Sequence, residues 1–283
     1  MDITNAAILG LIQGLAEFLP ISSSGHLNLA QALPGVNVVN AEQQLLFNIL
    51  LHMGTLLPVL AVFWKDWWQM LRHPIRNKTL LLLIIASLPA LAAVLVPAAK
   101  DFLDKYQTGT AILGACFLFT GLLLLLTQWI AKGRERQPQP RKPHRPPGVW
   151  NAIVMGCMQA VGILPGISRS GSTIFGGVAS GLNRETAAKF SFMMSAPAIL
   201  AAFLKEGYQV VSGPEGFASF QTAFQADLLP IAVGVGVAAV SGYLAIRFML
   251  RTITKVSLVW LSLYVILLGI AVIVLQRLGI LIA

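Results

Sequence analysis

The hydrophobic pattern of the chain is a series of long apolar segments separated by short polar ones. Six apolar segments cover residues of about 45–64, 79–99, 110–131, 187–206, 228–249 and 256–276. Each is close to the roughly 20 apolar residues that a helix needs to cross a bilayer. The pattern therefore predicts six transmembrane helices.

Two further apolar segments, residues 3–34 and 149–183, are interrupted by proline, serine and glycine. A helix from Ala6 to Leu19 would rise roughly 21 Å at about 1.5 Å per residue, less than a hydrocarbon core of about 30 Å. Irregular backbone at that depth is tolerated only where protein or a water-filled cavity surrounds it. We therefore expect each segment to form a re-entrant hairpin of two half-helices joined by a loop.

The two interrupted segments are related in sequence. A shift of 146 residues aligns Gln13 with Gln159 and Ser22–Gly25 with Ser168–Gly171. Each hairpin is followed by three predicted spans, and an odd number of spans makes the second half enter the membrane upside down, as in many transporters. We therefore predict an all-α polytopic membrane protein with an inverted-topology repeat. Its parts are a first repeat at 1–131, a linker at 132–148 and a second repeat at 149–283.

Composition and charge agree with a membrane protein. Hydrophobic residues make up 56% of the chain and charged residues 11%, whereas the formal net charge is +9. If the segment 65–78 is cytoplasmic, alternating spans place 15 of the 20 lysines and arginines on that side, 4 on the other, and Arg169 within the membrane. This distribution puts the basic, proline-rich linker in the cytoplasm and both termini outside, and it needs no nucleic-acid partner. We expect no cleaved signal peptide, because no basic stretch precedes the first apolar segment.

Two ionisable residues in the predicted hairpins are candidates for function. Glu17 and Arg169 lie in apolar surroundings, where charged groups are costly and by default mark a functional site. The planar guanidinium of Arg169 suits bidentate binding of a phosphate. A structural ion pair between Arg169 and Glu17 is the alternative, and both arrangements are compatible in the resting protein.

The first hairpin also carries a candidate metal site and a candidate nucleophile. Gln13 and Glu17 are one helical turn apart, so their oxygens share a face and suit a hard divalent cation such as Mg²⁺ or Ca²⁺. His26 follows a serine cluster, and an imidazole can activate a serine hydroxyl as a nucleophile. His52, in the first span, is interpreted as a core histidine.

The remaining hydroxyls and glycine of the two loops are expected to bind phosphate at the N-termini of the second half-helices. They are Ser22, Ser24, Ser168, Ser170, Gly171 and Thr173. Ser22 or Ser24 is equally suited to capping the half-helix that follows.

These residues resemble a known family. Gln13-xxx-Glu17, Pro20-Ile-Ser-Ser-Ser-Gly-His26 and Pro165-Gly-Ile-Ser-Arg-Ser-Gly171 are similar to motifs of the undecaprenyl-diphosphate phosphatases, the bacitracin-resistance proteins of bacterial envelopes. The resemblance implies a multi-pass phosphatase of the bacterial inner membrane that converts the C55 lipid diphosphate to the monophosphate and inorganic phosphate. It further implies a site open to the periplasm and a divalent cation.

The resemblance also assigns roles to individual residues. It carries the acidic motif to Gln13 and Glu17, the catalytic hydroxyl and imidazole to Ser23 and His26, and the phosphate-binding arginine to Arg169. Many members have glutamate where this chain has Gln13, so Glu17 takes the main share of metal binding. Whether Ser23 or His26 is the nucleophile stays open. Whether the protein forms a homo-oligomer also stays open. A transporter or flippase of a polyprenyl phosphate lipid is the alternative function.

Overall fold

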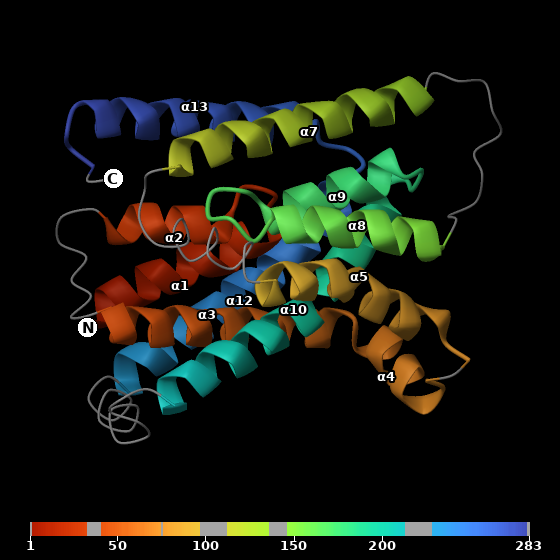
Figure 1. The fold of residues 1–283 in the computed structure, drawn as a ribbon, viewed down its shortest axis with the longest axis horizontal. Helices are drawn as coiled ribbons and strands as arrows, with labels where there is room; N and C mark the ends of the chain where they lie inside the picture. Colours follow the sequence, from red (N-terminus) through yellow and green to blue (C-terminus); the bar gives the residue numbers. More distant parts are fainter. Residues whose placement is uncertain are drawn as a thin grey trace.

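The computed structural model describes residues 2–32, 41–74, 76–96, 112–135, 146–212 and 228–281. These residues form eleven helices and no strands (Figure 1). The helices are α1 (Ile3–Phe18), α2 (Ser23–Gln31), α3 (Ala41–Val62), α4 (Trp64–Arg72), α5 (Lys78–Leu95), α7 (Leu113–Glu135), α8 (Val149–Val161), α9 (Arg169–Ala179), α10 (Arg184–Ser212), α12 (Leu228–Thr252) and α13 (Leu258–Arg277).

Five of these helices, namely α5, α7, α10, α12 and α13, are long and apolar enough to cross a membrane. A sixth span is formed if α3 and α4 are taken together, although they meet at a bend of 78°. Large apolar side chains face outward on these helices, and Leu88, Leu244 and Leu267 are each more than half exposed. Such a surface is stable in lipid but not in water, so the chain is a multi-pass membrane protein.

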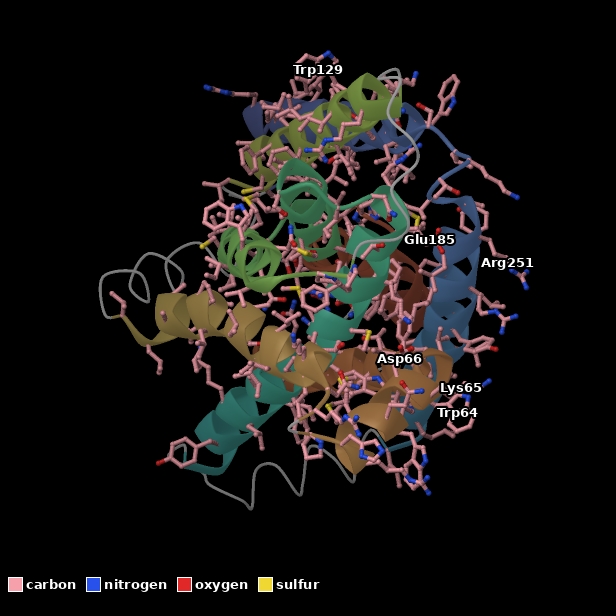
Figure 2. The ribbon with its side chains drawn as sticks, turned by 90° about the vertical axis from the view of Figure 1, so that its right-hand side faces the viewer. Trp64, Lys65, Asp66, Trp129, Glu185 and Arg251 are labelled. Carbon is pink, nitrogen blue, oxygen red and sulfur yellow. The ribbon has the colours of Figure 1, made fainter. Side chains whose placement is uncertain are left out.

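The segment 65–78 corrects one expectation from the sequence. It was expected to be a connecting loop, but the structure has helix α4 at Trp64–Arg72, and the preceding span ends at Val62. Arg72 lies over the ring of Trp68, 4.6 Å from its centroid. Figure 2 shows Trp64 and Lys65 at the edge of the molecule on this helix, pointing away from the protein. Tryptophan and basic side chains of this kind belong at a membrane–water interface, which explains a helix that turns away from the span before it.

Two shorter apolar helices, α1 and α8, each lead into a loop and a second short helix. They contain 16 and 13 residues, or roughly 24 and 20 Å at about 1.5 Å per residue. In Figure 1, α1 and α8 approach the middle of the molecule from opposite ends, and α2 and α9 follow them. Both follow-on helices are capped by a serine, because Ser22 Oγ accepts from the Gly25 N–H and Ser168 Oγ accepts from the Gly171 N–H. The capping role considered for Ser22 is thereby confirmed.

Small residues let these short helices pack closely on their neighbours. α1 lies along α12, where Gly10 faces the carbonyl of Gly234, and α8 lies along α5, where Gly156 faces the carbonyl of Ala86. A Cβ atom at either glycine would overlap that carbonyl oxygen. Close backbone approach at small residues is the usual way in which membrane helices pack.

The remaining contacts enclose the two loops. α7 packs on α13 and on α9, and α3 packs on α10 and α12. The predicted linker at 132–148 falls largely on residues 136–145, outside the described residues, but its first residues continue helix α7 as far as Glu135. The loops of the two short-helix pairs therefore lie inside a bundle of longer helices, where they position the site.

Candidate active site

Glu17 lies at the centre of the polar cluster that the two loops form. Its side chain is 5% exposed, and three groups donate to it. Arg169 Nη2 is 2.9 Å from Oε1, whereas Ser23 Oγ and Gln13 Nε2 are 2.6 Å and 3.1 Å from Oε2. The ion pair with Arg169, one of the two arrangements considered from the sequence, is present in this structure. Four predicted site residues are thus in direct contact.

Helix ends bring these residues together. Glu17 is in the last turn of α1, while Ser23 and Arg169 are the first residues of α2 and α9. Phe18, beside Glu17, packs edge-on against Phe192 of α10 with ring centroids 5.7 Å apart. The carboxylate therefore faces two helix N-termini, whose unpaired N–H groups and positive dipole ends favour anions.

The two loops achieve this geometry differently. Ser22 has φ 75°, which makes it the one non-glycine residue of the described chain with positive φ. In the second loop, the corresponding strain is avoided because Gly166, with φ +88°, makes the turn. Thr120 of α7 fixes this loop, since its Oγ1 donates to the Gly166 carbonyl at 2.8 Å and accepts from the Ser168 N–H at 2.9 Å. Backbone held in a disfavoured region is often found at functional sites, as it is here next to Ser23.

Several residues expected to bind phosphate make local hydrogen bonds in this structure, and their phosphate-binding role stays a prediction. Ser170 Oγ is 3.2 Å from Ser168 Oγ, and the Gly171 N–H is used by the cap. Thr173 Oγ1 donates to the Arg169 carbonyl at 2.8 Å and lies 2.6 Å from Ser191 Oγ. These bonds hold the start of α9, and with it Arg169, in place. Ser24 is half-buried, and its phosphate-binding role stays a prediction.

His26 is held away from Ser23. Its Nδ1 donates to the Ser22 carbonyl at 2.7 Å, so Nε2 accepts from the Tyr264 hydroxyl at 2.8 Å. Tyr264 also stacks on the imidazole, and Phe117 packs against it edge-on. No hydrogen bond joins His26 to Ser23 within the described structure; the hydroxyl expected to pair with imidazole pairs with Glu17. Tyr264 was not considered from the sequence, although a tyrosine within an apolar span is a signal for a polar partner.

His52 lies beside Glu17, although the sequence analysis did not assign it to the site. Its Nε2 lies 3.9 Å from Glu17 Oε2, and its Nδ1 is 2.7 Å from the Asn48 carbonyl. The interpretation of His52 as a core histidine is not what the structure shows, because a third of its side chain is exposed and it faces a carboxylate. Gln44, Asn48 and His52 recur every four residues in an apolar segment, which places them on one face of α3. That spacing was the available signal.

Most of the buried polar atoms without a hydrogen-bond partner among the described residues belong to the two loops and their helices. They are Gln13 Oε1, both amide atoms of Gln159, Ser172 Oγ and, away from the site, Trp67 Nε1. Such groups are rare and costly in folded proteins and need an explanation such as a ligand, an ion or water. Gln13 and Gln159 are corresponding positions in the two related segments. A polar ligand or water bound between the two loops would account for the unpartnered atoms of both side chains.

Sequence similarity to known proteins extends over nearly the whole chain. Residues 6–271 match the family described as bacitracin resistance protein BacA. The chain is 42% identical to an undecaprenyl-diphosphatase of Carboxydothermus hydrogenoformans over 279 residues, which covers 99% of each chain. It is 36% identical to an undecaprenyl-diphosphatase of Halothermothrix orenii over 276 residues, covering 97% of this chain and 98% of the relative. An undecaprenyl-diphosphatase 4 of Bacillus thuringiensis is also 36% identical and covers 98% of both chains.

The family match and the curated relatives each cover almost the entire chain. The family resemblance drawn from the two serine-rich loops is thereby confirmed. The chain belongs to the BacA family of bacitracin resistance proteins.

Proposed function

We propose that this chain is an integral membrane phosphatase that hydrolyses undecaprenyl diphosphate to undecaprenyl phosphate and inorganic phosphate. The full-length relatives carry the name undecaprenyl-diphosphatase. The main structural support is that Ser23 and Arg169 each form a hydrogen bond with a different carboxylate oxygen of Glu17. A hydroxyl, a base and a cation within hydrogen-bond distance are the groups that phosphoryl transfer requires.

The geometry supports Ser23 as the nucleophile and Glu17 as its base. Glu17 Oε2 already accepts a hydrogen bond from Ser23 Oγ at 2.6 Å, so the carboxylate takes the hydroxyl proton when Oγ attacks the terminal phosphorus. The bond from phosphorus to the bridging oxygen breaks, and undecaprenyl phosphate leaves. Water then attacks the phosphoserine, giving inorganic phosphate and the original serine. His26 would have to give up Tyr264 to attack, which is why we prefer Ser23.

Arg169 has the second role. In the resting site its guanidinium is paired with Glu17 at 2.9 Å. When the diphosphate enters, the guanidinium N–H groups that bond neither Glu17 nor the Ser191 carbonyl bind phosphate oxygens, and the N-termini of α2 and α9 add favourable electrostatic potential. Once Glu17 has gained the serine proton, its hold on Arg169 weakens and the arginine stabilises the charge of the leaving group.

We propose that the site also holds a divalent cation, Mg²⁺ or Ca²⁺, as expected from the sequence. Gln13 Oε1 is a buried oxygen without a partner among the described residues, and the Nε2 atom of the same amide donates to Glu17 Oε2 at 3.1 Å. No group of three His, Cys, Asp or Glu side chains able to hold a metal occurs in the described part of the chain. An amide oxygen and a carboxylate would therefore hold the ion together with water and substrate, and the ion would supply neutralisation of the diphosphate.

The topology that we propose is six spans and two re-entrant hairpins, arranged as an inverted repeat of 1–131 and 149–283 around the linker at 132–148. Contacts exchanged between the halves support it: α1 packs on α12 as α8 packs on α5, and Gly10 and Gly156 occupy corresponding positions in the two contacts. The distribution of lysine and arginine orients the chain in the bacterial inner membrane with the linker in the cytoplasm. We further propose that the site opens to the periplasmic side.

The test is release of inorganic phosphate from undecaprenyl diphosphate by the purified protein in detergent. We expect the wild type to release phosphate. Ser23→Ala should lose nearly all of this activity, because it lacks the proposed nucleophile. Absence of phosphate release by folded wild-type protein would overturn the enzymatic function. Equal release by the Ser23→Ala variant would remove Ser23 as nucleophile. The lipid transporter considered from the sequence is not favoured, because a carrier has no need of a hydroxyl held on a base.

A further inference from the structure

His52 has the geometry of a side chain prepared to bind something at Nε2. A carbonyl oxygen only accepts hydrogen bonds, so the 2.7 Å contact with the Asn48 carbonyl places a proton on Nδ1. Nε2 then faces Glu17 Oε2 at 3.9 Å, a distance too long for a hydrogen bond. In its neutral form the imidazole presents the Nε2 lone pair toward the carboxylate, and a cation between the two atoms would accept an electron pair from each.

The carboxylate does not need His52 as a hydrogen-bond donor. Arg169 balances the charge of Glu17 at Oε1, and Ser23 and Gln13 donate to Oε2. The neighbouring Gln13 Oε1, fully buried, is the acceptor that lacks a partner among the described residues. Gln13 Nε2 and His52 Nε2 both lie near Glu17 Oε2, so the unpartnered amide oxygen and the imidazole nitrogen belong to side chains that meet at the same carboxylate oxygen.

The hydrogen bond from Nδ1 to a backbone carbonyl is itself typical of metal-binding histidines. Such histidines almost always donate their second ring N–H to a carboxylate, carbonyl or water, which fixes the ring and raises its basicity. Side chains of α2 and α3 reinforce this arrangement, since Gln31 Nε2 donates to Asn48 Oδ1 at 2.9 Å and Gln44 Nε2 donates to Gln31 Oε1 at 2.6 Å. These bonds fasten α3 to α2 and hold the imidazole at the first loop.

We propose that His52 is a nitrogen ligand of the divalent cation, completing a mixed site with Glu17 Oε2 and Gln13 Oε1. The inference rests on the cation of the proposed function and adds a residue to it. One neutral imidazole, one carboxylate and one amide oxygen suit cations that accept nitrogen, such as Mn²⁺ and Co²⁺, better than Ca²⁺, which prefers oxygen ligands alone. His52 thus replaces, in the ligand set, the carboxylate that Gln13 does not provide.

Mn²⁺ bound to the purified full-length protein tests this inference without any substrate. Electron spin echo envelope modulation detects the ¹⁴N nucleus of a directly coordinated imidazole. We expect ¹⁴N coupling in the wild type, no coupling in Mn²⁺-loaded His52→Gln, and at least about tenfold weaker Mn²⁺ binding by that variant. His26→Gln is the matched control, because both ring nitrogens of His26 are already occupied, and it should keep the ¹⁴N coupling.

Three results would overturn the inference: ¹⁴N coupling that persists in His52→Gln, Mn²⁺ that binds to the wild type without ¹⁴N coupling, or a wild type that binds no Mn²⁺. The phosphatase itself fails separately, since that is decided by phosphate release from the lipid diphosphate.

Discussion

Replacing Glu17 by glutamine tests the site most directly, because the two side chains have nearly the same shape and differ in charge. Glu17→Gln removes the negative charge that pairs with Arg169, whose side chain is 17% exposed, and replaces the carboxylate that accepts from Ser23 with a neutral amide that cannot take its proton. We expect two separate losses from this single change. One is a loss of stability from the unpaired arginine, and the other is a loss of turnover from the missing base.

The magnitude follows from burial rather than from distance. Breaking a buried ion pair by removing one partner costs about 3–5 kcal/mol, because the other charge is left uncompensated. The chain offers a control of nearly the same length, since Lys189 Nζ lies 2.8 Å from Asp66 Oδ1 but both side chains are more than a third exposed. Exposed pairs contribute only about 0–1 kcal/mol, so Asp66→Asn should hardly change stability.

Unfolding in detergent and phosphate release, measured on the same preparations, provide the assay. Glu17→Gln should unfold at clearly lower temperature than Asp66→Asn and should turn over about 10²–10⁴-fold more slowly than the wild type, the range for a lost general base. In the double variant Glu17→Gln with Arg169→Gln, part of the stability should return, because no charge is left unpaired. Similar unfolding temperatures for the two single variants, or near-normal turnover of Glu17→Gln, would refute the reasoning.

Three further predictions concern roles and topology. Arg169→Lys keeps the charge but loses the planar fork, so phosphate release should fall at least about tenfold, roughly 1.4 kcal/mol of transition-state binding; unchanged kinetics would exclude a bidentate role. Ser23→Ala should abolish formation of a phosphorylated enzyme, whereas His26→Ala should still form it; a labelled protein in the serine variant would point to the imidazole as nucleophile. In a background free of native cysteines, Gly133→Cys should react with a membrane-impermeant thiol reagent only from the cytoplasm and Gly207→Cys only from outside, since both positions open onto free space; the reverse would invert the orientation.

The sequence was sufficient for the features that follow from local pattern. Apolar length predicted the long helices, and the proline and serine interruptions predicted where the short helices end and α2 and α9 begin. The contact between Glu17 and Arg169 was also considered, because two costly charges in an apolar chain have few partners available. These are consequences of hydrophobic length and charge, which any single segment displays.

Features that depend on how one helix is rotated against another could not be predicted from the sequence pattern. His52 faces Glu17 because α3 turns its Gln44–Asn48–His52 face toward the first loop, and the sequence does not specify that rotation. Tyr264 of α13 pairs with His26 across a separation of 238 residues, a contact that no local spacing reports. Helix α4 was missed because its nine residues, rich in tryptophan and charge, are too few for a membrane span. The segment was therefore assigned to a loop.

The sequence relation between the two loops accounts for the meeting of the proposed base, nucleophile and arginine in a single place. Ser23 and Arg169 are corresponding residues, each the first of its helix and each preceded by a capping serine, Ser22 or Ser168. Because the two loops meet at the middle of the molecule, equivalent positions approach the same point from opposite sides (Figure 1). Glu17 lies at that point, with one oxygen on the serine and the other on the arginine. In the proposed inverted repeat, a duplicated backbone supplies symmetric helix ends, while two different side chains at one repeated position supply the asymmetry that the proposed phosphoryl transfer needs.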